Sequence, residues 1–143
     1  MTCAYRSRRP TVVVSGGFDP IHIGHMRLIK AARQIGNVVV ILNNDGFLQH
    51  KKGFVFMPQE ERKEIIESVR GVSLVTIAID DDQTINKTLE LVRPDIFANG
   101  GDVTIENLRE KETCERLGIR VVFGVGGDKV QSSSSLVRRY TSQ

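Results

Sequence analysis

Short apolar runs alternate with amphipathic segments along nearly the whole chain, and this alternation restricts the fold more than any other feature. Most runs are rich in Val and Ile and lead into Gly, Asn or Asp, as buried strands do. The expected strands are TVVVS (11–15), NVVVILNN (37–44), VSLVTIAI (72–79), DIFAN (95–99) and IRVVFGV (119–125). Strands that are apolar on both faces favour a parallel sheet that is covered by helices on both sides.

The segments between these runs have the spacing and the end signals of helices. The segment 58–69 shows this well, because Pro58 and acidic residues occupy its first turn. The expected helices cover about 24–35, 58–69, 85–92, 105–118 and 132–140, whereas GFLQHKKGFVF (46–56) reads as a loop. We therefore expect a small Rossmann-like, doubly wound α/β domain of about five parallel strands.

The length of 143 residues predicts one domain, which we place at 11–143 after a flexible tail of residues 1–10. No apolar run approaches the roughly 20 residues of a membrane helix, and no apolar region follows the basic N-terminus, so we expect a cytoplasmic protein. Cys3 and Cys114 form no CxxC motif and are expected to be free thiols. The scattered basic residues and 6% aromatic content do not favour nucleic-acid binding.

Polar and glycine-rich segments follow the expected strands. They read FDPIHIGH, NNDGFLQHKKG, DDDQT, NGGD and GGDKVQSSSS, in chain order. Parallel α/β sheets bind ligands beyond the carboxyl ends of their strands. The sequence therefore predicts a binding site that these segments build together.

Two of the three histidines, His22 and His25, flank Gly24 at the expected start of the first helix. A helix start offers unpaired N–H groups and a positive dipole end, which favour a phosphate. The glycine spacing fits neither a Walker A loop nor a GxGxxG fingerprint. A zinc site is one alternative, although no acidic residue or cysteine stands at the supporting spacing. A plain surface or capping role is another.

The segment GGFDPIHIGHMRLIKAARQIG (16–36) resembles the signature of the HxGH nucleotidyltransferase superfamily, and the similarity extends over about 11–140. The small size and EERKEIIESV (60–69) are most similar to the cytidylyltransferase-type branch. The resemblance implies that a phosphate oxygen of one substrate attacks the α-phosphate of a nucleoside triphosphate, and pyrophosphate leaves. Mg²⁺ would arrive with the triphosphate, and no protein metal ligands are expected.

The resemblance also assigns roles to individual residues. His22 and His25 would hold the region between the α- and β-phosphates. The outer phosphates would be held by Arg62, by Lys51 or Lys52, and by the helix start at residues 132–134. Residues matching the family pattern would surround the triphosphate or its nucleoside: Gly16, Gly17, Phe18, Asp19, Gly24, Lys51, Gly100, Gly101, Asp102, Ser132, Ser133 and Ser134.

Several of these residues have simpler alternatives. Arg62 could pair with nearby acids, Lys51 and Lys52 could be solvated, Gly100 and Gly101 could form a turn, and one serine could cap the last helix. The acidic run of Asp80, Asp81 and Asp82 could cap the next helix, or it could contact a metal or the second substrate.

One departure from the family pattern bears on the substrate. The arginine-threonine pair of the glycerol-3-phosphate type is replaced by Gly126-Gly127-Asp128-Lys129, in which Lys129 could take the place of the arginine. By resemblance we expect CTP as the donor, with ATP next, and a phosphorylated alcohol or sugar as the acceptor. A homodimer is also expected. The alternative from another class is a catalytically silent nucleotide-binding module on the same fold.

Overall fold

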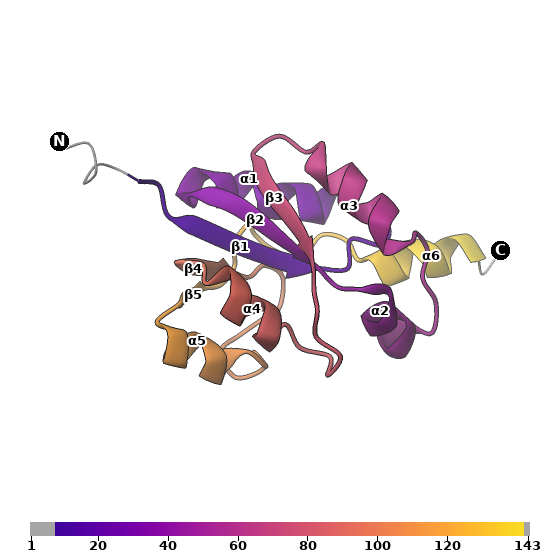
Figure 1. Cartoon of the computed structure of the whole chain (residues 1–143). Coiled ribbons are helices and arrows are strands. Elements are labelled where there is room, and N and C mark those ends of the chain that lie inside the picture. Colours follow the sequence, from indigo (N-terminus) through magenta and orange to yellow (C-terminus); the bar gives the residue numbers. More distant parts are fainter. Residues whose placement is uncertain (1–7, 142–143) are drawn as a thin grey trace.

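The computed structural model describes residues 8–141 and contains a five-stranded, all-parallel sheet (Figure 1). The strands are β1 (Thr11–Gly16), β2 (Asn37–Leu42), β3 (Val72–Ile77), β4 (Ile96–Ala98) and β5 (Arg120–Val122), in the spatial order β3-β2-β1-β4-β5. The helices are α1 (Ile23–Ile35), α2 (Asp45–Lys52), α3 (Gln59–Glu67), α4 (Asn86–Val92), α5 (Lys111–Leu117) and α6 (Ser133–Thr141). The doubly wound α/β fold expected from the alternating pattern is confirmed.

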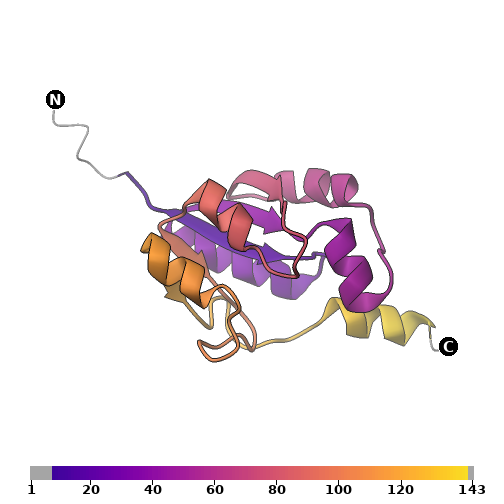
Figure 2. The same cartoon turned by 60° about the horizontal axis from the view of Figure 1, so that its bottom comes forward.

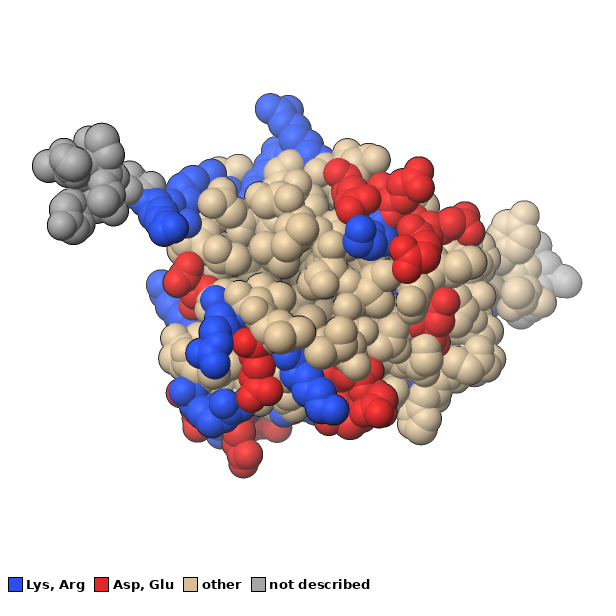
Figure 3. All heavy atoms as spheres, viewed as in Figure 1, with Lys and Arg blue, Asp and Glu red and all other residues tan. Residues whose placement is uncertain are grey.

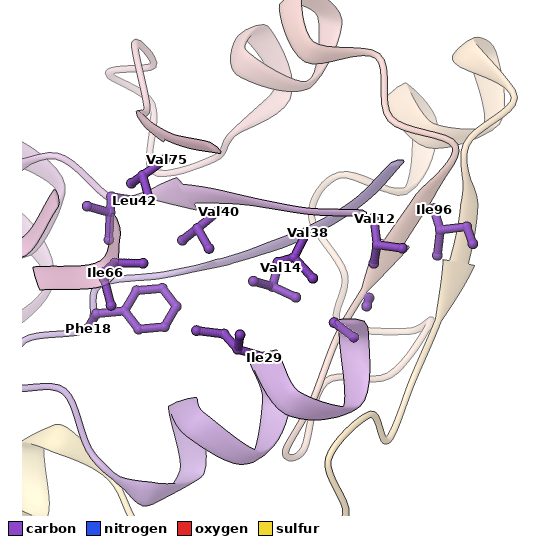
Figure 4. Close-up of a cluster of buried hydrophobic side chains, with 12 residues drawn as sticks. Val12, Val14, Phe18, Ile29, Val38, Val40, Leu42, Ile66, Val75 and Ile96 are labelled. Atoms are coloured by element: carbon purple, nitrogen blue, oxygen red, sulfur yellow. The ribbon is translucent and has the colours of Figure 1, made fainter. Parts of the chain in front are cut away.

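Helices cover both faces of the sheet, because alternate residues of each central strand point to opposite faces. Val12 and Val14 face the layer of α1 and α3, and Val13 faces the layer of α4 and α5 (Figures 1 and 2). Figure 4 shows Ile29 of α1 lying against the valines of the first layer. This double burial explains the unbroken apolar character of the central strands.

The order of the strands reverses at β1, which lies between β2 and β4. The loops after β1 and β4 therefore diverge at the carboxyl edge of the sheet and leave room for a ligand between them. The loop after β1 carries the two histidines at the start of α1.

Residues 46–56, expected to form a loop, contain most of α2 instead. Asn44 caps this helix by accepting a hydrogen bond from the Phe47 N–H at 2.8 Å, and Gly53 ends it with a φ of 81°. Asparagine and glycine at these two positions are ordinary helix-end signals. The expected helix 105–118 is also shorter, since α5 begins only at Lys111 and the preceding residues form turns.

The expected N-terminal tail is described only from residue 8, so residues 1–7, including Cys3, lie outside the described part. The Pro10 carbonyl already accepts a hydrogen bond from the Asn37 N–H at 2.8 Å. Cys114 is a free, buried thiol. Between residues 8 and 141 no helix is long and apolar enough to cross a membrane. On the face shown in Figure 3, Lys and Arg lie side by side with Asp and Glu over the lower left part, whereas the upper right part is mostly acidic.

Candidate active site

A cavity of about 540 Å³ opens at the carboxyl edge of the sheet, between the start of α1 and the loops after β4 and β5. Its wall contains every residue that the family resemblance assigned, except Arg62. Residues more than 100 positions apart in the chain therefore line one cavity, as expected from the segments that follow the strands.

The rings of His22 and His25 stack, with their centroids 3.8 Å apart and their planes 25° from parallel. His22 is the N-cap of α1, and its Nδ1 accepts a hydrogen bond from the Gly24 N–H at 3.0 Å. The Nδ1 of His25 accepts from the His22 N–H at 3.1 Å. Because each Nδ1 is an acceptor, each neutral ring carries its proton on Nε2 and keeps that N–H available as a donor.

Both histidines are held in the neutral form. Burial lowers the pKa of His25 to about 3, and the charges of His22 and Lys52 act in the same direction. Burial also lowers the pKa of His22, aided by the charge of Lys129. The pair therefore suits hydrogen-bond donation to phosphate oxygens. The capping alternative is correct as well, since the same rings that line the cavity also cap α1.

The depressed pKa of His25 should make stability depend on pH. The folded chain resists protonation at this ring, while the unfolded chain takes up the proton near pH 6.5, so stability falls as the pH drops from 6.5 towards 3. Relative to His25→Ala, the wild type should lose roughly 1 kcal/mol of unfolding free energy per pH unit between pH 6 and 4. Urea unfolding of both proteins at several pH values measures this. Parallel pH profiles for the two proteins would contradict the neutral His25.

The absence of a side chain at Gly24 leaves room for the His22 ring. A Cβ at residue 24 would lie 2.8 Å from Cε1 and 3.1 Å from Nδ1 of that ring. Gly24→Ala should therefore displace the ring while helix α1 still forms, and weaken the binding of a phosphate-bearing ligand about tenfold, corresponding to about 1.4 kcal/mol. The matched control is Gly46→Ala in the first turn of α2, where a Cβ meets only Asn44 Oδ1 at 3.4 Å. Equal dissociation constants of the two variants for that ligand would contradict this role of Gly24.

Phe18 and Asp19 stabilise the loop between β1 and α1 (residues 17–22), which leads into the histidine pair and is termed the motif loop. Phe18 is 2% exposed, and its ring centroid lies 4.4 Å from that of His25. The buried Asp19 carboxylate accepts hydrogen bonds from the Phe56 N–H at 2.7 Å and the Met57 N–H at 2.6 Å. Both residues border the cavity. With both carboxylate oxygens occupied, Asp19 orients the loop and ties it to the segment before α3.

Lys52 is anchored to the same loop. Its Nζ donates to the Asp19 carbonyl at 2.8 Å and lies 4.0 Å from the Asp19 carboxylate. Burial lowers the pKa of this ammonium, while Asp19 opposes that shift. The neighbouring Lys51 is exposed, and its Nζ lies 5.9 Å from the centroid of the Phe47 ring. The two lysines therefore differ in their freedom to move towards a ligand.

The placement of Arg62 differs from the expectation of a phosphate contact. Its side chain is 0% exposed and does not line the cavity. The guanidinium donates to three backbone carbonyls and to the Asp45 carboxylate, which lies 2.7 Å away. The carbonyls belong to Gly17, Asn43 and Met57. Pairing with a nearby acid was the simpler alternative, but the partner is Asp45 and the site is buried.

The serine stretch 132–135, at the start of α6, contacts the motif loop. The Ser132 hydroxyl accepts from the Ser135 N–H at 3.0 Å, so the expected capping role falls on this serine. The Ser133 hydroxyl donates to the Pro20 carbonyl at 2.7 Å, across 113 positions of sequence. This bond holds the N-terminal end of α6 beside the histidines.

The loops after β4 and β5 form the opposite wall. Gly100 permits their close approach, because a Cβ there would lie 2.8 Å from the Val125 carbonyl oxygen. Asp102 and Lys129 lie 3.8 Å apart, with their side chains 83% and 52% exposed. An ion pair this exposed contributes little stability and can be given up to a ligand.

The acidic run does not reach this cavity. Asp80 is buried and accepts hydrogen bonds from the Lys87 N–H and from the N–H and hydroxyl of Thr88. It therefore stabilises the first turn of α4, as the capping alternative predicted. Within residues 8–141 no group of three or more His, Cys, Asp or Glu side chains is arranged to hold a metal ion.

Several residues of the wall were not assigned individually from the sequence, although Asn43 and Asn99 belong to segments expected to build the site: Ser15, Arg27, Leu28, Asn43, Asn99 and Val125. Asn43 and Asn99 carried a usable signal, because each is a polar residue directly after a buried strand. Arg27 and Leu28 lie on α1, and only the three-dimensional packing brings them to the cavity.

Comparison with known proteins agrees with this geometry. Residues 13–140 match the family model described as cytidylyltransferase-like. The chain is 32% identical over 110 residues to the FAD synthase of Ferroglobus placidus. This match covers 76% of this chain and 70% of that protein. It is 33% identical over 120 residues to the bifunctional protein HldE of Syntrophotalea carbinolica, covering 81% of this chain but 24% of that protein. The chain thus spans about a quarter of the length of this HldE.

Solved structures share the fold. The lipopolysaccharide core biosynthesis protein of Thermoplasma volcanium superposes with a TM-score of 0.67 at 23% identity, covering 86% of this chain and 98% of that chain. Pantothenate synthetase of Thermus thermophilus gives a TM-score of 0.62 at 17% identity, covering 93% of this chain and 63% of that chain. The extent of the family match and the FAD synthase relative confirm the resemblance seen in the histidine motif: the chain belongs to the cytidylyltransferase-like family.

Proposed function

We propose that this chain is a nucleotidyltransferase, which transfers a nucleoside monophosphate from a nucleoside triphosphate to a small phosphate ester. The observation that carries the proposal is the stacked pair of His22 and His25, with both neutral rings at the wall of the cavity and at the start of α1. Donors fixed in advance at a site of developing negative charge are a principal means of catalysis.

The reaction needs no strong general base, because the attacking phosphate is already ionised. One of its oxygens forms a bond to the α-phosphorus, and the bond from that phosphorus to the bridging oxygen breaks. The electron pair leaves with pyrophosphate. His22 and His25 would donate hydrogen bonds from their Nε2–H groups to oxygens of the α- and β-phosphates, which flank that breaking bond. Positioning and charge stabilisation then supply the catalysis.

The outer phosphates would lie towards Lys52, Lys129 and the start of α6. The exposed Lys129 would give up its ion pair with Asp102 and pair with the triphosphate instead. Residues 132–134 offer the positive end of a helix dipole. Mg²⁺ would enter as part of the nucleotide substrate, since it binds phosphate oxygens and keeps several waters.

The identity of the base is the finer part of the proposal. The branch resemblance favours CTP, and ATP is the second choice. The FAD synthase relative adds support for ATP, because FAD contains an adenylyl group. For the acceptor we propose a phosphorylated alcohol or sugar.

The test is pyrophosphate release by the full chain with Mg²⁺ and CTP, ATP, GTP or UTP, each combined with a panel of phosphate esters. We expect release with one nucleotide in strong preference to the others, and only when an ester is present. Tight nucleotide binding without release across the whole panel would contradict the enzyme and favour a silent nucleotide-binding module.

A further inference from the structure

A second cavity, of about 590 Å³, lies beside the first at the carboxyl edge of the sheet. It is bounded by α2, by the segment after β3, and by the turns before α5. The two cavities share five wall residues, Ser15, Asn43, Lys51, Asn99 and Val103. A ligand in one cavity would therefore meet a ligand in the other at these residues.

Three of the shared residues form a polar row across the sheet. Asn43 follows β2, Ser15 belongs to β1 and Asn99 follows β4, and these three strands are neighbours. Asn43 is only 9% exposed, yet within residues 8–141 its side-chain amide has no hydrogen-bond partner. Asn99 is 8% exposed, and its amide makes one long bond of 3.4 Å to the Phe97 carbonyl.

Neither amide belongs to the side-chain groups that are buried without a partner in the described part of the chain, so both open onto the cavities and can bond a polar ligand there. Lys51 stands at the same junction and favours an anionic ligand there. Within the described part of the chain the Lys51 ammonium makes no ion pair, and it lies 5.9 Å from the centroid of the Phe47 ring. Lys52, by contrast, is engaged by Asp19.

We propose that the second cavity binds the acceptor, that the polar row and Lys51 receive its phosphate, and that its body is a polyhydroxy chain or ring. This proposal rests on the nucleotidyltransferase proposed above. An attacking phosphate must lie against the α-phosphate, and the residues shared by both cavities are placed to contact both groups. Lys51 is thereby assigned to the acceptor, and not to the triphosphate.

The wall of the second cavity favours hydroxyl groups over a flat aromatic ring. Gln83, Asn107 and Arg109 supply donors, and Glu110 supplies a carboxylate. Arg109 Nη1 donates to the Gln83 carbonyl at 3.0 Å, and Glu110 Oε2 accepts from the Ile85 N–H at 3.0 Å, so these side chains are already positioned.

Aromatic surface is scarce by comparison. Phe97 is 2% exposed and offers almost no face to a ligand, and the half-buried Phe47 lies beside the Lys51 ammonium. The apolar wall residues Ile85 and Leu108 are also only 3% and 8% exposed, so a flavin ring would find little apolar surface, whereas the hydroxyls of a sugar or polyol phosphate would find both donors and acceptors.

The first test is binding. The ¹⁵N-labelled full chain is saturated with an α,β-methylene triphosphate analogue, then titrated separately with glycerol 3-phosphate, glucose 1-phosphate and flavin mononucleotide. We expect a polyol or sugar phosphate to shift the side-chain amide signals of Asn43, Asn99 and Asn107. Shifts from flavin mononucleotide alone, or no shift of these signals by any ester, would overturn the proposal. Failure of the analogue itself to shift Gly24 and His25 would overturn the proposed function instead.

The second test separates the two lysines. Lys51→Met should raise the KM for the acceptor at least tenfold and leave the dissociation constant of the nucleotide analogue within twofold. The matched control is Lys30→Met, an exposed lysine of α1 that lines neither cavity. If Lys51→Met weakens the analogue tenfold and leaves the acceptor KM unchanged, Lys51 belongs to the triphosphate and the assignment is wrong.

Discussion

The double variant His22→Ala/His25→Ala should lose nucleotidyl transfer almost completely while the chain stays folded. Removing one preorganised donor from a site of developing charge typically costs about 10²- to 10³-fold in kcat. The two rings stack and cap the same helix end, so their effects should not multiply. We expect each single variant to approach the loss of the double variant, with pyrophosphate release measured under saturating nucleotide.

The fold should tolerate this change. The alanines remove the two caps of α1, which costs about 1–2 kcal/mol for a helix end. The apolar face of α1, including Ile29 and Ala32, remains in the core. Circular dichroism and urea unfolding provide the control. A folded double variant that releases pyrophosphate at nearly the normal rate would remove the histidines from the mechanism.

The sheet could be predicted from the sequence because its evidence is local. Val12, Val13 and Val14 are all fully buried, and a run of β-branched residues buried on both faces has few other interpretations. Helix α2 was missed because its polar surface hides the pattern, with Leu48 as its only buried residue. Its caps at Asn44 and Gly53 were visible in the sequence, but caps without an apolar face are a weak signal.

The site was predictable to the extent that topology decides it. The carboxyl ends of parallel strands share one edge, so the loops that bear His22, Gly100 and Ser132 had to converge. The roles of buried charged residues were not predictable in this way. Asp19 and Arg62 bond to backbone groups 37 and 45 positions away, respectively, and no side-chain pattern marks those partners.

Arg62→Met should destabilise the fold by about 3–5 kcal/mol, the usual cost of removing one partner from a buried charged network. The variant leaves the Gly17, Asn43 and Met57 carbonyls without these donors, while the half-exposed Asp45 carboxylate can turn to water. Urea unfolding measures the loss. The matched control is Lys63→Met on the same helix, whose exposed pair with Glu67 is worth at most about 0.5 kcal/mol.

Arg62→Lys distinguishes the buried network from a phosphate contact. A lysine ammonium has three donors at one point and cannot span the carbonyls that the planar guanidinium joins, so it should recover only part of the stability. Gly17 is the first residue of the motif loop, and Asn43 lies in the polar row. Weaker nucleotide binding should therefore accompany the loss of stability in both Arg62→Met and Arg62→Lys. If Arg62→Lys were fully stable and bound nucleotide tenfold more weakly, Arg62 would contact the triphosphate after all, through a conformation in which α3 releases it.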